Sequence, residues 1–243
     1  MRLGLLVCDH VHPDLRSIAG DYNDMFAELF SAFGDLDLVE YDLTESRFPS
    51  SVRECDAWIT TGSKRSVYEN EGWIHGLADL VREFARSDVP FVGVCFGHQM
   101  MAHALGGEVR RSPNGWGVGS KVVHVPRSEP WMEVEGWRGG SFRVLNSHAD
   151  QVDKLPRGAE VLGSNEHCPV SVMRLGPRML GIQGHPEFVP AYSRRLMEVR
   201  RGRLIPETVV DAGLASLDDP PDQALLARWI VGFVVQALEV HAS

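Results

Sequence analysis

Three observations in the sequence predict an α/β fold with a central, mostly parallel sheet between layers of helices. Through about the first 105 residues, short apolar runs of strand length alternate with stretches of helical spacing. From 108 to about 183 the pattern changes to short β-type segments separated by Gly, Pro and Asn. After Pro190 the spacing is helical again. We therefore expect a parallel core, an antiparallel β portion in the second half and a helical C-terminal extension.

The predicted strands of the first half are continuous or alternating apolar runs, typical of a sheet buried by helices. They span residues 3–7, 36–41, 57–60 and 91–94. Helical spacing of apolar side chains between them predicts two helices, at 22–33 and 72–87. A third helix is expected at 99–105, where Gly106 and Gly107 would end it. This order describes repeated βα units.

The second half is expected to be mostly antiparallel because its β-type segments are short and separated by turn residues. These segments are 117–125, 141–145, 159–163, 170–174 and 179–183. A final helix is predicted at 222–241, with an apolar face that includes Trp229 and Phe233. The basic stretch from Arg194 to Arg203 is interpreted as a solvated helix face, and docking of an acidic partner is the alternative.

Composition excludes several classes of protein. The chain has 243 residues, of which 44% are hydrophobic and 23% charged, so it can bury a core. Its net charge of −9 repels phosphate backbones, and we expect no nucleic-acid ligand. No window approaches the roughly 18 apolar residues of a membrane span, and the apolar start is too short for a signal peptide. We therefore expect a cytoplasmic protein, not attached to a membrane, with its four cysteines reduced.

The most informative segment runs from Gly93 through Cys95 to Gly97, where a predicted strand ends at a cysteine and a helix follows. A nucleophile elbow needs these residue types, because side chains at the flanking positions would collide with neighbouring backbone. The N-terminus of the following helix favours the thiolate, the form that attacks a carbonyl carbon. The alternative for these five residues alone is a structural cysteine between two turn glycines.

A cysteine nucleophile needs a base, and His185 is the best candidate among ten histidines. It follows a strand-like run and precedes Pro186, which favours extended backbone. Residues two apart in an extended chain project to the same side, so Glu187 can lie beside the imidazole and hold it. The alternative is that His185, Pro186 and Glu187 only begin a turn and a helix.

Two further features carry weaker signals. The segment from Ile59 to Ser63 is a short strand that enters a glycine-containing loop, and a loop N–H paired with that of Phe96 could bind an oxyanion. Taken alone, however, Thr-Gly-Ser is ordinary loop sequence. His10 and His12 with Asp9 lack further ligands at a telling spacing, so we expect no metal site.

Together these segments resemble the class I, triad-type glutamine amidotransferases, and are similar to the stand-alone glutaminase of GMP synthases. Gly93 to Gln99 matches the family's Gly-x-Cys-x-Gly-x-Gln, and Gly181 to Glu187 matches its Gly-x-Gln-x-His-Pro-Glu. Ser147 to Asp150 resembles its Ser-His-x-Asp segment. The resemblance covers about residues 1–188. It implies a flavodoxin-like three-layer catalytic domain over 1–188. Residues 189–243 have helical spacing and are too few for a synthetase domain, so we expect a helical extension packed on the same domain.

The resemblance also implies roles for individual residues. The triad would be Cys95, His185 and Glu187, and the oxyanion-hole amides would come from Gly62 and Phe96. The amino-acid end of glutamine would be held, partly through backbone groups, by Gln99, Ser147 and His148. The chain departs from the family at Thr61-Gly62-Ser63, where many members have Gly-Gly-Pro. We expect this loop to be more mobile and the oxyanion hole less firmly preformed.

The implied reaction is hydrolysis of the γ-amide of glutamine through a γ-glutamyl thioester on Cys95, without a cofactor. An ammonia-accepting synthetase, if there is one, must be a separate polypeptide, because the chain has no phosphate-binding loop and 189–243 is too short for a synthetase domain. Two alternatives remain open. One is a stand-alone γ-glutamyl peptidase, and the other is a non-catalytic binding or regulatory protein that has kept the fold.

Overall fold

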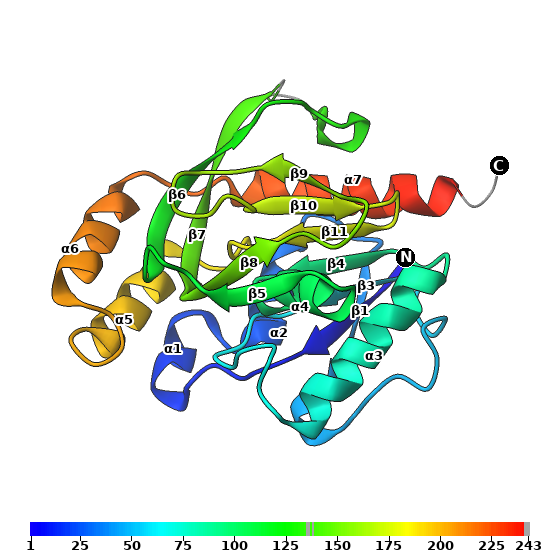
Figure 1. The fold of residues 1–243 in the computed structure, drawn as a ribbon, viewed down its shortest axis with the longest axis horizontal. Coiled ribbons are helices and arrows are strands. Elements are labelled where there is room, and N and C mark those ends of the chain that lie inside the picture. Colours follow the sequence, from blue (N-terminus) through cyan, green and yellow to red (C-terminus); the bar gives the residue numbers. More distant parts are fainter. Residues whose placement is uncertain (135–136, 138, 241–243) are drawn as a thin grey trace.

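A seven-stranded sheet forms the centre of the computed structural model, which describes residues 1–134, 137 and 139–240. Its strand order is β2-β1-β3-β4-β11-β10-β9, and Figure 1 shows these strands at the middle of the molecule. The first five strands in this order are mutually parallel, β10 pairs antiparallel with β11, and β9 pairs antiparallel with β10. The predicted α/β class with a mostly parallel sheet is confirmed. In sheet order the strands are Asp37–Asp42, Arg2–Val7, Ala57–Thr60, Phe91–Val94, Met179–Ile182, Val172–Leu175 and Ala159–Gly163.

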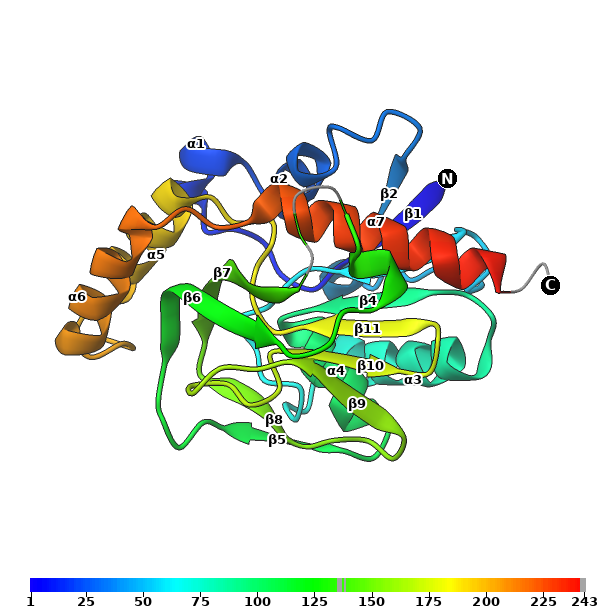
Figure 2. The same cartoon turned by 90° about the horizontal axis from the view of Figure 1, so that it is seen from above.

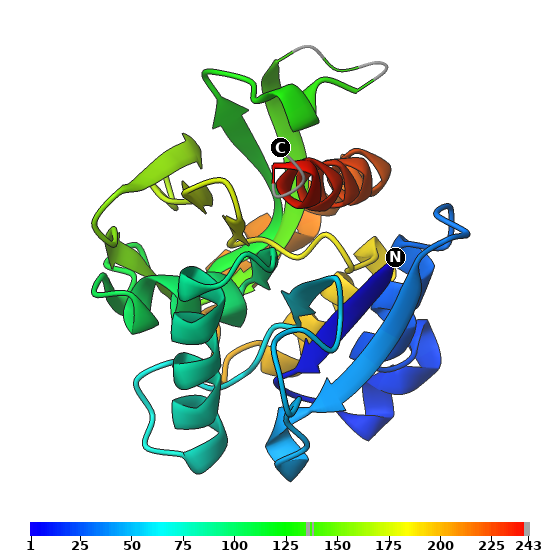
Figure 3. The same ribbon diagram turned by 90° about the vertical axis from the view of Figure 1, so that its right-hand side faces the viewer.

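Helices cover both faces of this sheet, which gives three layers. The helices α3 (Gly72–Arg86) and α4 (Phe96–Ala104) pack on one face. The helices α2 (Tyr22–Leu29) and α7 (Gln223–Glu239) pack on the other. Figures 2 and 3 show α7 and α3 on opposite sides of the strands. Within the described residues, no helix combines the length and apolar character needed to cross a bilayer.

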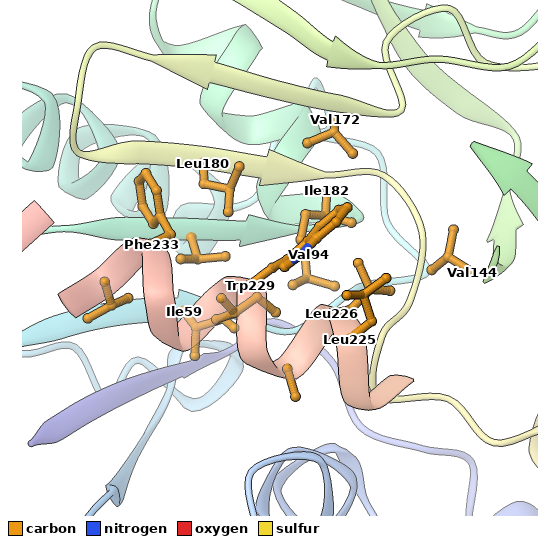
Figure 4. Close-up of a cluster of buried hydrophobic side chains, with 14 of the residues drawn as sticks. Ile59, Val94, Val144, Val172, Leu180, Ile182, Leu225, Leu226, Trp229 and Phe233 are labelled. Atoms are coloured by element: carbon orange, nitrogen blue, oxygen red, sulfur yellow. The ribbon is translucent and has the colours of Figure 1, made fainter. Parts of the chain in front are cut away.

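The helix α7 contributes its apolar face to the main core. Figure 4 shows Trp229 and Phe233 directed from α7 toward the sheet, Trp229 toward Ile182 and Phe233 toward Leu180. Trp229 is 1% exposed, and its indole N–H donates to the carbonyl of Met132 at 3.0 Å. The C-terminal helix therefore stabilises the sheet that carries the site. Residue 241, the predicted end of this helix, lies outside the described residues.

The second half adds two antiparallel pairs and two helices beside the main sheet. One pair joins β5 (Glu108–Arg111) to β8 (Asp150–Lys154), and the sequence did not predict either strand, because both are short and rich in charged residues. The other pair is a hairpin of β6 (Gly117–Val125) and β7 (Gly140–His148). The helices that follow are α5 (Pro190–Arg200) and α6 (Glu207–Ala215).

Three predicted features differ from the structure: two helix boundaries and the pairing of one strand in the half expected to be mostly antiparallel. The helix expected over 22–33 ends at Leu29, because the chain turns at 30–33 through hydrogen bonds such as Phe33 N–H to the carbonyl of Phe30. The helix expected from Gln99 begins at Phe96, directly after the elbow. The strand 179–183 lies next to β4 as a parallel strand and pairs antiparallel only with β10.

The carboxyl ends of four parallel strands lie along one edge of the sheet, the edge at which open α/β sheets bind ligands. The residues that follow β1, β3 and β4 there include Asp9, Gly62 and Cys95. The register pairs Val94 with Ile182, and the N–H of Cys95 donates to the carbonyl of Ile182 at 2.8 Å. This pairing brings the end of β11, and with it His185, next to the elbow.

Candidate active site

Cys95 occupies a strained turn between β4 and α4. Its backbone has φ 49° and ψ −95°, and only one other non-glycine residue among those described, Ser46, has a positive φ. Non-glycine residues adopt this region at a cost of about 1–3 kcal/mol and mainly at functional sites. The turn places the thiol, whose residue is 4% exposed, at the floor of a pocket. This is the geometry expected of a nucleophile elbow.

The two glycines of the elbow are required for different reasons. A Cβ at Gly93 would lie 2.5 Å from the backbone of Gly97, as the sequence interpretation expected. A Cβ at Gly97 would instead overlap the side chain of Thr60, so the predicted collision with backbone is wrong at this position. Thr60 cannot move away cheaply, because its hydroxyl accepts the N–H of Val94 at 3.1 Å.

His185 and Glu187 lie side by side under the pocket. The Nδ1–H of His185 donates to Oε1 of Glu187 at 2.7 Å, and the two residues are 3% and 2% exposed. The backbone N–H of His185 donates to the carbonyl of Leu145 at 2.7 Å, which fixes the start of the turn. The ring of Phe188 stacks on the imidazole with centroids 3.9 Å apart and planes 7° apart. These contacts hold the ring in one orientation and leave Nε2 for proton exchange.

Charge decides the protonation state of His185. Burial alone would lower its pKa, but the neighbouring negative charges of Cys95 and Glu187 raise the pKa above its usual value of 6.5. An imidazolium is therefore favoured at neutral pH. A cationic imidazole beside a thiolate is the charge state that a cysteine hydrolase uses, because it supplies both a nucleophile and a proton for the leaving group.

Gly62 lies against both members of this pair. A Cβ built on it would be 2.7 Å from Cε1 of His185 and 3.6 Å from Cβ of Cys95. The loop after β3 is held at both sides: the hydroxyl of Thr61 accepts the N–H of Cys8 at 2.9 Å, and the N–H of Lys64 donates to Asp9 at 2.9 Å. The sequence prediction of greater mobility in this loop stays a prediction.

Phe96 is the first residue of α4, and the N–H groups of a first helical turn have no partner within the helix. Its amide adjoins the nucleophile directly, as an oxyanion donor must. The structure thus places two residues next to Cys95: Phe96 at the start of α4 and Gly62 in the loop after β3. Their role as an oxyanion hole stays a prediction.

Two glutamines connect the elbow to the opposite wall. The amide nitrogen of Gln183 lies 3.7 Å from the sulfur of Cys95, and its carbonyl oxygen accepts from Nε2 of Gln99 at 3.1 Å. Nε2 of Gln99 also donates to the carbonyl of Asp150 at 2.8 Å. Gln99 therefore lines the pocket in a fixed rotamer. The sequence predicted a contact to substrate for Gln99 but no role for Gln183.

Ser147 and His148 line the same pocket. The Nδ1–H of His148 donates to the carbonyl of Asp150 at 3.0 Å, the acceptor that Gln99 also uses. Burial, helped by the nearby His167, lowers the pKa of His148 to about 3, so this ring is neutral. A neutral histidine that is anchored to a backbone carbonyl is better suited to shaping the pocket wall than to donating a proton to the substrate. The structure places both predicted residues in the pocket wall, and their contact with substrate stays a prediction.

The pocket over Cys95 has a volume of about 720 Å³. One wall comes from the elbow and β7, and the other from α5 and the segment of His10 to Arg16. Among the residues that the structure describes, no three His, Cys, Asp or Glu side chains are grouped so that they could hold a metal ion. A second cavity of about 490 Å³, next to His10 and Asp21, includes neither Cys95 nor His185.

Sequence reasoning missed several residues of this pocket, among them Phe188 and Arg200. Phe188 directly follows the His-Pro-Glu segment, so its position was a signal that could have been used. Arg200 was interpreted as part of a solvated face, which is wrong for this residue: it is partly buried, lines the pocket and donates to the hydroxyl of Ser147 at 2.9 Å. Arg194, Arg195 and Arg203 are exposed, as predicted.

Comparisons with known proteins agree on one family. The family model described as glutamine amidotransferase class-I matches residues 23–198. A glutamine amidotransferase-like protein of Schizosaccharomyces pombe is 29% identical over 96% of this chain and 98% of its own length. Gamma-glutamyl peptidase 3 of Arabidopsis thaliana is 26% identical over 96% and 95%. A glutamine-hydrolysing GMP synthase of Neisseria meningitidis serogroup B is 36% identical over 53% of this chain and 24% of its own length.

The fold has a close match among solved structures. The crystal structure of a glutamine amidotransferase from Thermotoga maritima superposes with a TM-score of 0.73 at 19% identity. The match covers 98% of this chain and 97% of that one. It therefore includes the helices after Pro190, and the flavodoxin-like arrangement expected from the sequence is confirmed.

Proposed function

The chain belongs to the class-I glutamine amidotransferase family, and we propose that it hydrolyses a γ-glutamyl amide, most simply the γ-amide of glutamine, through a thioester on Cys95. One observation carries the proposal. The strained turn that presents Cys95 lies beside a buried imidazole whose Nδ1–H is held by Glu187 at 2.7 Å. This arrangement has the nucleophile, the base and the group that orients the base.

The first half of the reaction forms the thioester. The thiolate of Cys95 attacks the γ-carbonyl carbon, and the oxyanion that results accepts hydrogen bonds from the N–H groups of Gly62 and Phe96. The tetrahedral intermediate then collapses, the C–N bond breaks, and the imidazolium of His185 gives its proton to the departing amine. With glutamine the departing amine is ammonia. Glu187 keeps the imidazole in the tautomer that places Nε2 toward the reacting atoms.

The second half releases glutamate. His185, now neutral, takes a proton from a water molecule, and the hydroxide equivalent attacks the thioester carbonyl at the same oxyanion site. The C–S bond breaks, so Cys95 leaves as a thiolate and His185 regains its positive charge. Gln99, Ser147 and His148 would hold the amino-acid end of the γ-glutamyl group throughout. The residues named need no cofactor for these steps.

Ammonia formed in this way is either released or passed to a synthetase on a separate chain. The supporting observation is the similarity to part of a GMP synthase from Neisseria meningitidis, of which the match covers 24%. A synthetase that accepts the ammonia would dock at the mouth of the pocket. Stimulation of glutamine hydrolysis by a candidate synthetase is the measurement that tests this partner.

A second candidate function is the hydrolysis of γ-glutamyl peptides. The pocket of about 720 Å³ is large for glutamine alone, since sites of roughly 300–1,000 Å³ enclose drug-sized ligands. The relative from Arabidopsis thaliana that is named a gamma-glutamyl peptidase aligns over 96% of this chain. Both functions use the same three residues and differ only in the leaving amine.

The test is a substrate panel with purified protein. Glutamine and several γ-glutamyl dipeptides are incubated with the wild type and with Cys95→Ala, and glutamate release is measured. The expected result is hydrolysis by the wild type alone, and equal rates in the two proteins would contradict the triad. A strong preference for glutamine would count against the peptidase function. A glutamine-analogue electrophile should label Cys95, and failure to label it would favour a non-catalytic protein.

A further inference from the structure

We propose that Arg200 binds a carboxylate group of the substrate, on the side of the pocket from which the amine leaves. The proposal rests on the proposed function and names the kind of leaving group that this site selects: an amine that itself carries a carboxylate, as in a γ-glutamyl amino acid or short peptide. Glutamine lacks this group.

The guanidinium of Arg200 is held in place by two elements. Nη1 donates to the hydroxyl of Ser147 at 2.9 Å, and the central carbon lies 5.7 Å from the ring centroid of Trp116. Both neighbours line the pocket that also contains Cys95 and His185. Arg200 is at the C-terminal end of α5, where an arginine often caps the helix. The guanidinium of Arg200 instead donates to the hydroxyl of Ser147, which directs it toward the pocket.

Most other cations of the pocket are already neutralised. Three of them form ion pairs with carboxylates from neighbouring segments, so their positive charge is compensated within the protein. These pairs are Arg16 with Asp21 at 2.8 Å, Lys64 with Asp9 at 2.9 Å, and Arg65 with Glu69 and Glu71 at 3.1 and 2.8 Å.

Arg200 differs from these cations because it has no carboxylate within ion-pair distance in the part of the chain that the structure describes. Arg111 and Arg203 also lack such a partner there but are exposed, where solvent screens them. A partly buried, oriented guanidinium binds a carboxylate through two parallel hydrogen bonds, and this geometry is specific to arginine. Arg200 therefore has both the charge and the free donors for an anionic ligand.

A line of side chains on α5 connects Arg200 to the catalytic imidazole. Phe188 stacks on His185, and Tyr192 contacts Phe188 edge-on with ring centroids 4.7 Å apart. Leu196 and Arg200 follow Tyr192 at intervals of four residues, so the three lie on one face of the helix. The line begins at Phe188, beside the group that protonates the leaving amine, and from Tyr192 to Arg200 it rises about 12 Å along the helix axis.

Aliphatic side chains line the pocket near Arg200. Leu196 is buried, and Val199 and Leu204 are 45% and 61% exposed although both line the pocket. Exposed aliphatic side chains beside a cation fit an amine with an aliphatic body and a terminal carboxylate. Glutamine would leave this wall and Arg200 without a contact, because its leaving group is ammonia.

A carboxylate can reach Arg200 from two sources, the leaving group or the α-carboxylate of the γ-glutamyl group. The experiment separates them with three substrates: glutamine, γ-glutamylglycine and γ-glutamylglycinamide. All three have the α-carboxylate, but only γ-glutamylglycine has a carboxylate on its leaving group. Wild type, Arg200→Met and Arg200→Lys are compared, and Arg195→Met is the matched control. Arg195 is an exposed residue of the same helix and pairs with Glu198 at 3.3 Å.

We expect Arg200→Met to raise KM for γ-glutamylglycine by roughly 10- to 100-fold, the range for loss of a charge-assisted hydrogen bond. The kcat for this substrate and the KM values for the other two substrates should change by less than about threefold. Arg200→Lys should keep part of the preference for γ-glutamylglycine over the glycinamide, because a point charge remains. Arg195→Met should match the wild type on all three substrates.

Two outcomes would overturn the proposal. An equal rise in KM for all three substrates would assign Arg200 to the α-carboxylate and remove it from the leaving side. Unchanged KM values for every substrate would show that Arg200 binds no carboxylate. If the wild type hydrolyses none of the three, the proposed function fails. Calorimetric titration of Cys95→Ala and Cys95→Ala/Arg200→Met with γ-glutamylglycine and its glycinamide then still tests the carboxylate contact, since the same Arg200-dependent preference is expected in binding.

Discussion

A Cβ atom on Gly62 would lie 2.7 Å from Cε1 of His185, closer than side chains approach in folded proteins. Because Gly62 has no side chain, it leaves the space that the imidazole of His185 occupies. Because the same virtual atom is 3.6 Å from Cβ of Cys95, the loop after β3, the elbow and the end of β11 meet at this one point. Small changes here should affect catalysis more than folding.

Gly62→Ala should lower kcat for γ-glutamyl hydrolysis by at least about 100-fold, because a shift of about 1 Å in a catalytic group costs that much. Steady-state kinetics measure the loss, and thermal unfolding shows whether the fold survives. Gly72→Ala is the matched control, since a Cβ at Gly72 has nothing within 4 Å. Equal kcat in Gly62→Ala and the wild type would mean that His185 does not need its present position.

Glu187→Gln should move the alkaline limb of the kcat profile to lower pH. The negative charge of Glu187 raises the pKa of His185, so its removal lowers that pKa. The proton that His185 gives to the leaving amine is then lost at a lower pH. We expect kcat at neutral pH to fall by roughly 100- to 10,000-fold, since the amide also permits the wrong tautomer. An alkaline limb at the wild-type position would contradict the assigned role of Glu187.

Trp229→Ala should destabilise the protein by about 3–5 kcal/mol, the usual cost of removing a large aromatic side chain from a core. Trp229 packs α7 against the sheet, and the change would also remove the indole donor to the carbonyl of Met132, which then accepts only from the N–H of Val134. Urea unfolding measures the difference. Val235→Ala on the same helix is the control, because Val235 is 43% exposed and its truncation should cost less than about 0.5 kcal/mol. A loss in Trp229→Ala as small as that expected for Val235→Ala would contradict the packing of α7 in the core.

Much of the fold could be predicted because its signals are local. Apolar runs such as Leu3 to Val7 and Phe91 to Val94 became buried parallel strands, since only a sheet covered on both faces buries every residue of a strand. The strands β5 and β8 could not be predicted, because their pairing depends on where the chain folds back and their side chains are mostly charged.

Some parts of the candidate site could likewise be predicted from local sequence, whereas others depend on how distant segments pack. The proximity of His185 and Glu187 follows from extended backbone over three residues, so the sequence was enough to expect it. Arg200 enters the pocket only because α5 packs against β7 and brings it to Ser147. In the sequence it is one of several arginines in a basic helix, and no local pattern separates it from Arg194 or Arg195.

The central claim is that a γ-glutamyl group is carried by the sulfur of Cys95. Its most direct test is intact-mass spectrometry of the protein quenched in acid during turnover of glutamine or γ-glutamylglycine, followed by peptide mapping. We predict a mass increase equal to one γ-glutamyl group, located on the peptide that contains Cys95 and missing in Cys95→Ala. An adduct on Cys168, or catalysis that continues in Cys95→Ala with no adduct, would contradict the account.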